Sequence, residues 1–387
     1  MAMEVKLLQP VKVVCTDDLG ETLVDIMQTA GYSRPLMVTD SFVGSMPLVV
    51  AARTKLEQVG VDVAVFDQVK PDPLCETVES GVEAFEAHKA DSIIAIGGGS
   101  SMDVARGINI VRVNGGSIIE YTDPAKPIAS CNGMIAVPTT AGTGSEMSNA
   151  LVVTEGSTGR KLAVLADPAV SEYAVLNADL MLTLPVKMTI ACGLDAFCHA
   201  AEGYLSRMAS PVTDAICEKA MFLLYNYLPR AVANGQDREA RERVMVASTL
   251  AGWMLNNAGT IAGHSIAHVL GAKYHIVHGE AVGYALPAVM EFVAPVRAHK
   301  VREIGQILGA VYPENAPDEQ VAIIASRAFK DFRDRMLGLH PVEDYGISVE
   351  ELVSNAQAVV DERFAGNTPR DIDLQAAEQL LEGFGSR

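Results

Sequence analysis

The stretch SIIAIGGGSSMD, residues 92–103, indicates how this chain is expected to fold. A run of apolar residues leads into three glycines, and residues 102–113 then carry apolar side chains at helical spacing. A buried strand, a glycine turn and a helix in this order form one unit of a parallel sheet. Because glycines let a ligand approach the backbone and a helix N-terminus attracts anions, the turn is a candidate diphosphate cradle. An ordinary βα turn capped by Ser101 or Asp103 explains the same residues.

The alternation of strand and helix continues on both sides of this stretch. Strands are expected at residues 11–15, 35–39, 61–66, 92–96 and 134–138, and helices at 19–30, 46–59, 76–88 and 102–113. Residues 152–164 surround GSTGR and are typical of a β-hairpin. This half therefore predicts a Rossmann-like α/β domain with a mainly parallel sheet, residues 1–185.

After Pro185 the chain becomes rich in Ala, Leu and Met at helical spacing, and no strand is expected beyond about residue 180. Helices are expected at residues 188–206, 212–233, 241–257, 282–308 and near 374–381. The second half thus predicts an all-α domain over residues 186–387. A length of 387 residues also favours two domains.

Composition narrows the classes of function. The net charge of -18 repels nucleic acid and anionic membranes, and no apolar run approaches the length of a membrane span. The N-terminal sequence lacks a basic segment followed by a long apolar one, and the six cysteines form no CxxC pair. We therefore expect a cytoplasmic protein that binds neither nucleic acid nor membranes.

Four of the eight histidines lie in GHSIAHVLGAKYHIVHG, residues 263–279. His264 and His268 are spaced to share one helix face, whereas a helix break is expected at Gly271, before His278. In GLDAFCHAAEGY, residues 193–204, an aspartate and a histidine show the same one-turn spacing. Carboxylate and imidazole are common ligands of catalytic divalent metals, although neither pair fixes a metal alone.

Two further segments are candidates for binding a nucleotide. Asp40 ends the second expected strand, where a carboxylate can bind both ribose hydroxyls and would repel the 2′-phosphate of NADP. Residues 137–148, VPTTAGTGSEMS, follow another strand and offer hydroxyl groups from Thr139 and Thr140. A helix cap for Asp40 and a turn-rich loop for residues 137–148 are the simpler alternatives.

Taken together, GGGSSMD, PTTAGTGSE, GLDAFCHAAEGY, GHSIAHVLGAKYHIVHG and the late NTPR resemble the iron-containing (group III) alcohol dehydrogenase family. The ordered match covers nearly the whole chain. The resemblance implies a dehydroquinate synthase-like architecture, with a dinucleotide-binding domain, a helical domain and a metal in the cleft between them.

The resemblance also assigns individual residues. It implies that the metal ligands are Asp195, His199, His264 and His278. His268 matches a second, non-ligating histidine beside the substrate, and His275 has no counterpart. The expected NAD-binding residues are Asp40, Asp72, Gly98, Gly99, Ser100, Asp103, Thr139, Thr140, Ser148 and Lys161. Asp72 replaces a common asparagine near the nicotinamide, and Arg106 replaces a common lysine.

We therefore expect an NAD-dependent oxidoreductase that interconverts a small primary alcohol and its aldehyde at a divalent metal, with His268 relaying a proton. The family implies Fe(II), with Zn(II) as the alternative, and a homodimer or larger homo-oligomer. No cluster of basic residues indicates a charged substrate, although a short hydroxy acid stays open. A metal hydrolase would not need the glycine cradle, a dehydroquinate synthase-like lyase would need clustered basic groups, and a non-catalytic sensor would bind NAD without turnover.

Overall fold

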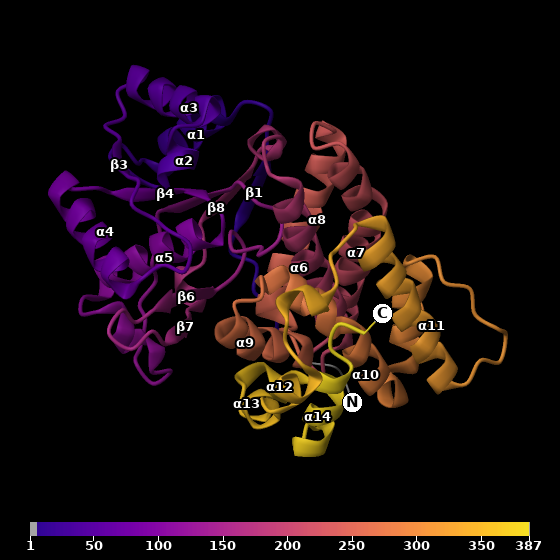
Figure 1. Cartoon of the computed structure of the whole chain (residues 1–387). Helices are drawn as coiled ribbons and strands as arrows, with labels where there is room; N and C mark the ends of the chain where they lie inside the picture. The colour runs from indigo at the N-terminus through magenta and orange to yellow at the C-terminus, as the bar shows by residue number, and fades with distance from the viewer. Residues whose placement is uncertain (1–5, 387) are drawn as a thin grey trace. The chain divides into compact units, whose positions relative to one another are not determined.

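The computed structural model describes residues 6–386, which form two compact units (Figure 1). The first unit is residues 8–181, and the second is residues 182–386 together with Lys6 and Leu7. Residues 1–5 and 387, at the outer ends of the two expected domains, lie outside the described residues. Each unit is described separately below.

The first unit is built on a six-stranded sheet in the order β1-β8-β5-β4-β2-β3, and each pair of neighbouring strands is parallel. This confirms the expected α/β fold with a parallel sheet. The strands are β1 (Lys12–Cys15), β2 (Pro35–Val38), β3 (Ala64–Phe66), β4 (Ser92–Gly97), β5 (Met134–Pro138) and β8 (Tyr173–Leu176).

Strand β8 was not expected from the sequence. It pairs with β1 and β5, and all four of its residues are buried. A fully buried strand lacks the alternation of apolar and polar residues that marks a strand with one exposed face. A run of only four apolar residues therefore did not indicate a strand.

Helices cover both faces of this sheet (Figure 1). Ile94 and Ile96 of β4 belong to a core cluster with helices α1 (Leu19–Ala30) and α3 (Pro47–Gln58). Ile93 and Ala95 belong to a cluster with α4 (Cys75–His88) and α5 (Gly99–Asn114). Successive residues of a strand point to opposite faces, which explains why β4 is apolar throughout. The helices of this unit are α1 (Leu19–Ala30), α2 (Ser41–Gly44), α3 (Pro47–Gln58), α4 (Cys75–His88) and α5 (Gly99–Asn114).

Strands β6 (Ala150–Thr154) and β7 (Lys161–Leu165) form a separate antiparallel pair, as the GSTGR segment predicts. A bridge between Leu74 and Thr154 places the segment before α4 beside this hairpin. The expected binding residues Asp72 and Lys161 are thereby brought together.

The second unit is helical, and residues 182–386 contain no strand. This confirms the expected all-α region. Its α-helices are α6 (Val186–Leu205), α7 (Pro211–Ala233), α8 (Arg238–Asn257), α9 (Ala262–Tyr274), α10 (His278–Ile307), α11 (Asp318–Lys330), α12 (Val349–Val353), α13 (Ala356–Val360) and α14 (Leu374–Glu382). No helix among residues 6–386 has the length and apolar character needed to cross a membrane.

Helix α6 packs against α7, α8 and α10, and glycines allow the close approach. A Cβ at Gly193 would lie 2.4 Å from Leu228 of α7, and one at Gly203 would lie 1.8 Å from the sulfur of Met254 of α8. Most of α6 is therefore buried, including the face that carries the expected metal ligands.

The helix break expected at Gly271 is wrong. Helix α9 continues through Gly271 to Tyr274 and ends at His275, which adopts the left-handed conformation at φ 57°. Buried Ala267 and Leu270 hold the helix against its neighbours, so one glycine does not end it. His275 is exposed and its N–H caps the helix by donating to the carbonyl of Gly271.

Candidate active site

Helix α6 supplies two of the four expected metal ligands. Asp195 and His199 are one turn apart on the same face, and their side chains are only 5% and 6% exposed. His199 Nε2 lies 3.5 Å from Asp195 Oδ1.

Helices α9 and α10 bring the other two expected ligands to the same point. His264 lies in the first turn of α9, and His278 is the first residue of α10. Their Nε2 atoms lie 3.7 Å and 3.5 Å from Asp195 Oδ1. Three imidazole nitrogens from three helices thus surround one carboxylate oxygen.

This cluster fits a divalent cation. Among the described residues, Asp195 Oδ1 and His264 Nε2 are buried and have no hydrogen-bond partner. Ligand atoms of Asp195, His199 and His264 all lie within 4.8 Å of one another. Buried polar atoms without partners are rare, and one carboxylate with imidazoles is a common donor set for Fe(II) or Zn(II).

The charges of the cluster favour an ionised aspartate. Burial alone would raise the pKa of Asp195, but His199, His264 and His278 outweigh it and hold that pKa below its ordinary value. Burial opposes protonation of His264, whereas Glu202 and Asp195 raise its pKa to about 10. The site therefore holds negative charge that a metal cation can neutralise.

His268 lies beside this cluster on α9. Its ring stacks on that of His278 at a centroid distance of 5.4 Å, and its Nδ1 lies 3.0 Å from Glu362 Oε1. Glu362 also accepts hydrogen bonds from the Ser265 hydroxyl and the Phe364 N–H.

Two carboxylates next to these histidines were missed in the sequence. Glu202 contacts His264, and it follows Asp195 by seven residues, so helical spacing could have placed it on the same face. Glu362 lies in the segment after α13, where no periodic pattern links it to His268. Only the tertiary fold brings Glu362 to this site.

In the first unit, the glycine turn lies between β4 and α5. Gly97 adopts φ 156°, and a Cβ there would lie 2.3 Å from Ser101 Oγ. A Cβ at Gly98 would lie 3.4 Å from Thr140, so the turn runs close to the loop that follows β5. Thr139 is buried and donates its N–H to the carbonyl of Gly97.

Asp40 caps the short helix α2 and faces the glycine turn. Its Oδ1 accepts the N–H groups of Phe42 and Val43, each at 2.9 Å. Its Oδ2 would lie 4.0 Å from a Cβ at Gly97. Strands β2 and β4 are parallel neighbours, and β3 lies on the other side of β2. The point at which the strand order of such a sheet reverses is a common nucleotide-binding site. The capping role thus leaves Asp40 next to the candidate cradle.

Four of the remaining expected cofactor residues already have partners within the first unit. Lys161 Nζ lies 2.6 Å from Asp72 Oδ1, and this ion pair is solvent-exposed. Asp103 accepts the Val152 N–H, and Ser148 accepts the Ala150 N–H. Ser100 lies in the first turn of α5, directly after Gly99. These assignments to NAD stay predictions.

Arg106 has a structural role in this loop region. It is fully buried and donates to the carbonyls of Ser145, Ala150 and Ala169. Its Nη1 atom lies 3.9 Å from Asp103 Oδ1. Arg106 thus holds the segment after Thr140 against α5.

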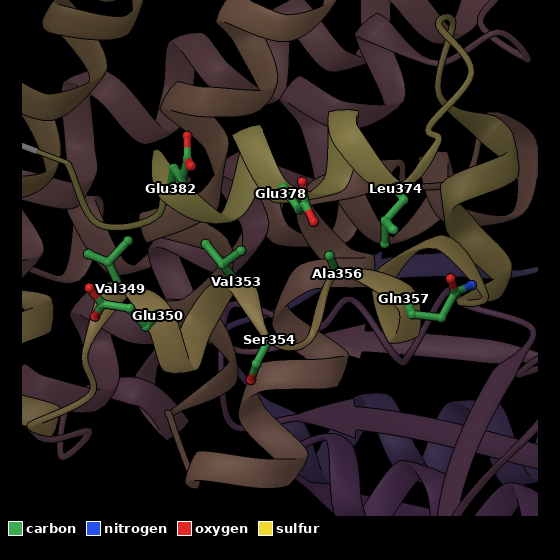
Figure 2. Close-up of a pocket in the computed structure, with 9 residues that line it drawn as sticks. All are labelled: Val349, Glu350, Val353, Ser354, Ala356, Gln357, Leu374, Glu378 and Glu382. Atoms are coloured by element: carbon green, nitrogen blue, oxygen red, sulfur yellow. The ribbon is translucent and has the colours of Figure 1, made fainter.

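A separate, open pocket of about 540 Å³ lies in the second unit, among α12, α13 and α14 (Figure 2). It is lined by Val349, Glu350, Val353, Ser354, Ala356, Gln357, Leu374, Glu378 and Glu382. None of these residues is an expected site residue.

A buried aspartate with three convergent histidines, in a chain that also has a parallel sheet with a glycine turn, defines a metal- and nucleotide-dependent enzyme. Residues 10–178 match the model of the iron-containing alcohol dehydrogenases, and residues 189–384 match the C-terminal model of the same family. The chain belongs to the iron-containing alcohol dehydrogenase family. It is an oxidoreductase that uses NAD(H) and a divalent metal, as the sequence predicts.

Individual relatives agree with this assignment. The chain is 33% identical to the NAD-dependent methanol dehydrogenase of Bacillus methanolicus, over 92% of this chain and 93% of the relative. It is 32% identical to lactaldehyde reductase of Escherichia coli strain K12, over 92% and 94%. The crystal structure of a 1,3-propanediol oxidoreductase matches 99% of this chain and 100% of its own, with a TM-score of 0.91 and 29% identity.

Proposed function

We propose that this enzyme interconverts a small, uncharged primary alcohol and its aldehyde. The observation that carries the proposal is the convergence of three histidine Nε2 atoms on the buried Asp195 Oδ1. The similar methanol dehydrogenase, lactaldehyde reductase and 1,3-propanediol oxidoreductase are all named for small alcohols or aldehydes, which supports this substrate class.

In this proposal Asp195, His199, His264 and His278 hold the metal. When bound, the metal supplies positive charge that polarises the alcohol or carbonyl oxygen of the substrate. Fe(II) is the ion we propose, because the family is iron-containing, and Zn(II) is the alternative that the same donor set accepts.

His268 is proposed to move the proton of the substrate hydroxyl. An imidazole can accept and release a proton near neutral pH. Because the Glu362 carboxylate accepts a hydrogen bond from Nδ1, the Nε2 atom of His268 is the one left to exchange a proton. Its ring stacks on His278, which supports a position beside the substrate.

The first unit is proposed to bind the cofactor, which supplies the hydride acceptor or donor. Backbone N–H groups at Gly99 and Ser100 begin helix α5 and can bind diphosphate oxygens, while Asp40 binds the adenosine ribose. The threonines of the neighbouring loop, Thr139 and Thr140, add hydroxyl donors.

We also propose a cytoplasmic homo-oligomer. All six cysteines are free thiols, which suits a reducing compartment. Strand β1 lies at an edge of the sheet, and Val13 on it is 41% exposed. An exposed apolar edge strand favours pairing with a second copy of the chain.

The test is NADH consumption by metal-free protein to which Fe(II) or Zn(II) is restored separately. The substrates are short aldehydes, with a short keto acid and a phosphorylated aldehyde as charged comparisons. Metal-dependent turnover of an uncharged aldehyde supports the proposal. Turnover of only the charged compounds, or none despite bound NAD and metal, contradicts the proposed substrate class.

A further inference from the structure

Glu202 on α6 is fully buried and makes three hydrogen bonds to the start of α9. Its Oε1 lies 2.8 Å from His264 Nδ1. Its Oε2 accepts the backbone N–H of Ile261 at 2.8 Å and that of His264 at 3.2 Å. One carboxylate thus contacts both the ring of an expected ligand and the helix turn that carries it.

These contacts determine where a proton sits on His264. Oε2 accepts two backbone N–H groups, and an ionised carboxylate has no proton to donate. His264 Nδ1 must therefore be the donor to Oε1. Nδ1 keeps its proton whether His264 carries one proton or two, so in the neutral ring Nε2 is the nitrogen that offers a lone pair to a metal. Nε2 is the atom that faces Asp195 Oδ1.

Gly263 leaves the space that Glu202 occupies. A Cβ at Gly263 would lie 2.3 Å from Glu202 Oε1 and 2.9 Å from its carboxyl carbon. Any side chain at position 263 would therefore push Glu202 away from the His264 ring. This close approach independently indicates that the contact between Glu202 and His264 requires a residue without a side chain at position 263.

We propose that Glu202 is a positioning residue for the metal centre, fixing His264 in the one tautomer and orientation that present Nε2 to the metal. The inference rests on the proposed ligand set. Glu202 also adds a second buried negative charge to that of Asp195, so the two carboxylates match the charge of a divalent cation.

The variant Glu202→Gln tests this with little change in shape. The Gln oxygen can still accept the two backbone N–H groups, but its NH₂ group then faces His264 Nδ1 and needs an acceptor there. The proton of a neutral His264 moves to Nε2, where it blocks the metal. We expect metal affinity, measured by chelator competition, to fall about 10- to 100-fold, with little change in the thermal midpoint of the metal-free protein.

The matched control is Glu362→Gln, because Glu362 makes the same contact with His268, which is not an expected ligand. Its metal affinity should stay within about twofold of wild type. Gly263→Ala keeps the charge of Glu202 but displaces it, so it should also weaken metal binding. Loss of affinity in Gly263→Ala but not in Glu202→Gln indicates a packing role and overturns the proposal.

A second measurement needs no variant. In Zn(II)-loaded wild-type protein, ¹⁵N NMR of labelled histidine should show His264 with a proton on Nδ1 and none on Nε2. A proton on Nε2 overturns the proposal, as does unchanged affinity in Glu202→Gln. If the wild-type protein binds no divalent metal, the proposed metal site itself is wrong, so the two failures are distinguishable.

Discussion

Gly279 on α10 touches the backbone of Ala191 on α6 so closely that a Cβ on Gly279 would lie 1.9 Å from the Ala191 carbonyl oxygen. Gly279 directly follows the expected ligand His278, and Ala191 lies one turn before Asp195. This contact therefore sets the distance between the start of α10 and the helix that carries two of the other expected ligands, Asp195 and His199.

Replacing Gly279 with Ala should disturb both the fold and the metal site. The clash is with backbone rather than with a flexible side chain, so α10 must shift, at about 1–3 kcal/mol of the free energy of unfolding. We expect urea unfolding to show this loss in the free energy of unfolding. Metal binding should also weaken, because His278 moves with the helix. Gly366→Ala is the control, since a Cβ there meets no described atom within 4 Å. Equal effects in both variants would contradict this explanation.

Replacing His268 with Ala should slow catalysis without removing the metal. Positioned proton transfer contributes about 10²- to 10⁴-fold to rate, so kcat should fall within that range. Metal content, measured by elemental analysis, should stay at the wild-type value. Loss of metal from this variant would instead make His268 a ligand.

Much of the fold could be predicted because its signals are local. The strands that begin at Lys12, Pro35 and Ser92 show β-branched and apolar runs, and α1 matches its expected range. The sequence did not predict strand β8, and the helix break predicted at Gly271 is wrong, because these two conformations do not depend on local signals. Burial between neighbouring elements decided both conformations, and a short sequence window does not contain that information.

The candidate site likewise contains residues that local sequence patterns predict and residues that only the tertiary fold brings together. Asp195, His199 and His264 stand out through residue type and helical spacing, and the fold brings them together. The link between His268 and Glu362 joins segments 94 residues apart, and no local pattern encodes it. The pairing of Asp72 with Lys161 is similar, because it depends on the hairpin lying beside the segment before α4.

Stability should depend on the ionisation of Asp103. Burial raises the pKa of its carboxyl group to about 7 from 3.8, with Arg106 and the Val152 N–H opposing the shift. The folded state thus holds the proton more tightly than the unfolded state. The protonated carboxyl group of Asp103 therefore contributes to the free energy of unfolding. This contribution is fully present below about pH 4 and is lost as the pH rises through about 7, at up to about 1.4 kcal/mol per pH unit.

The variant Asp103→Asn isolates that effect, because Asn keeps an acceptor for the Val152 N–H and does not ionise. Urea unfolding of cofactor-free protein at pH 5 and pH 8 measures it. We expect the variant to gain stability relative to wild type as pH rises between these values. A difference that is constant with pH would show that the Asp103 carboxyl group ionises with an ordinary pKa in the folded protein.

Replacing Asp40 with Asn should relax the choice between NAD and NADP. The Asn oxygen can still accept the N–H groups of Phe42 and Val43 and cap α2, so the thermal midpoint should change little. Asp40→Ala removes the cap and should lower the free energy of unfolding by about 1 kcal/mol. Removing the negative charge ends its repulsion of a 2′-phosphate, and we expect NADP⁺ to bind about tenfold tighter in titrations of cofactor binding. Asp25→Asn, at an exposed position on α1, controls for net charge and should not change NADP⁺ affinity. An unchanged NADP⁺ affinity in Asp40→Asn would leave Asp40 with the capping role alone.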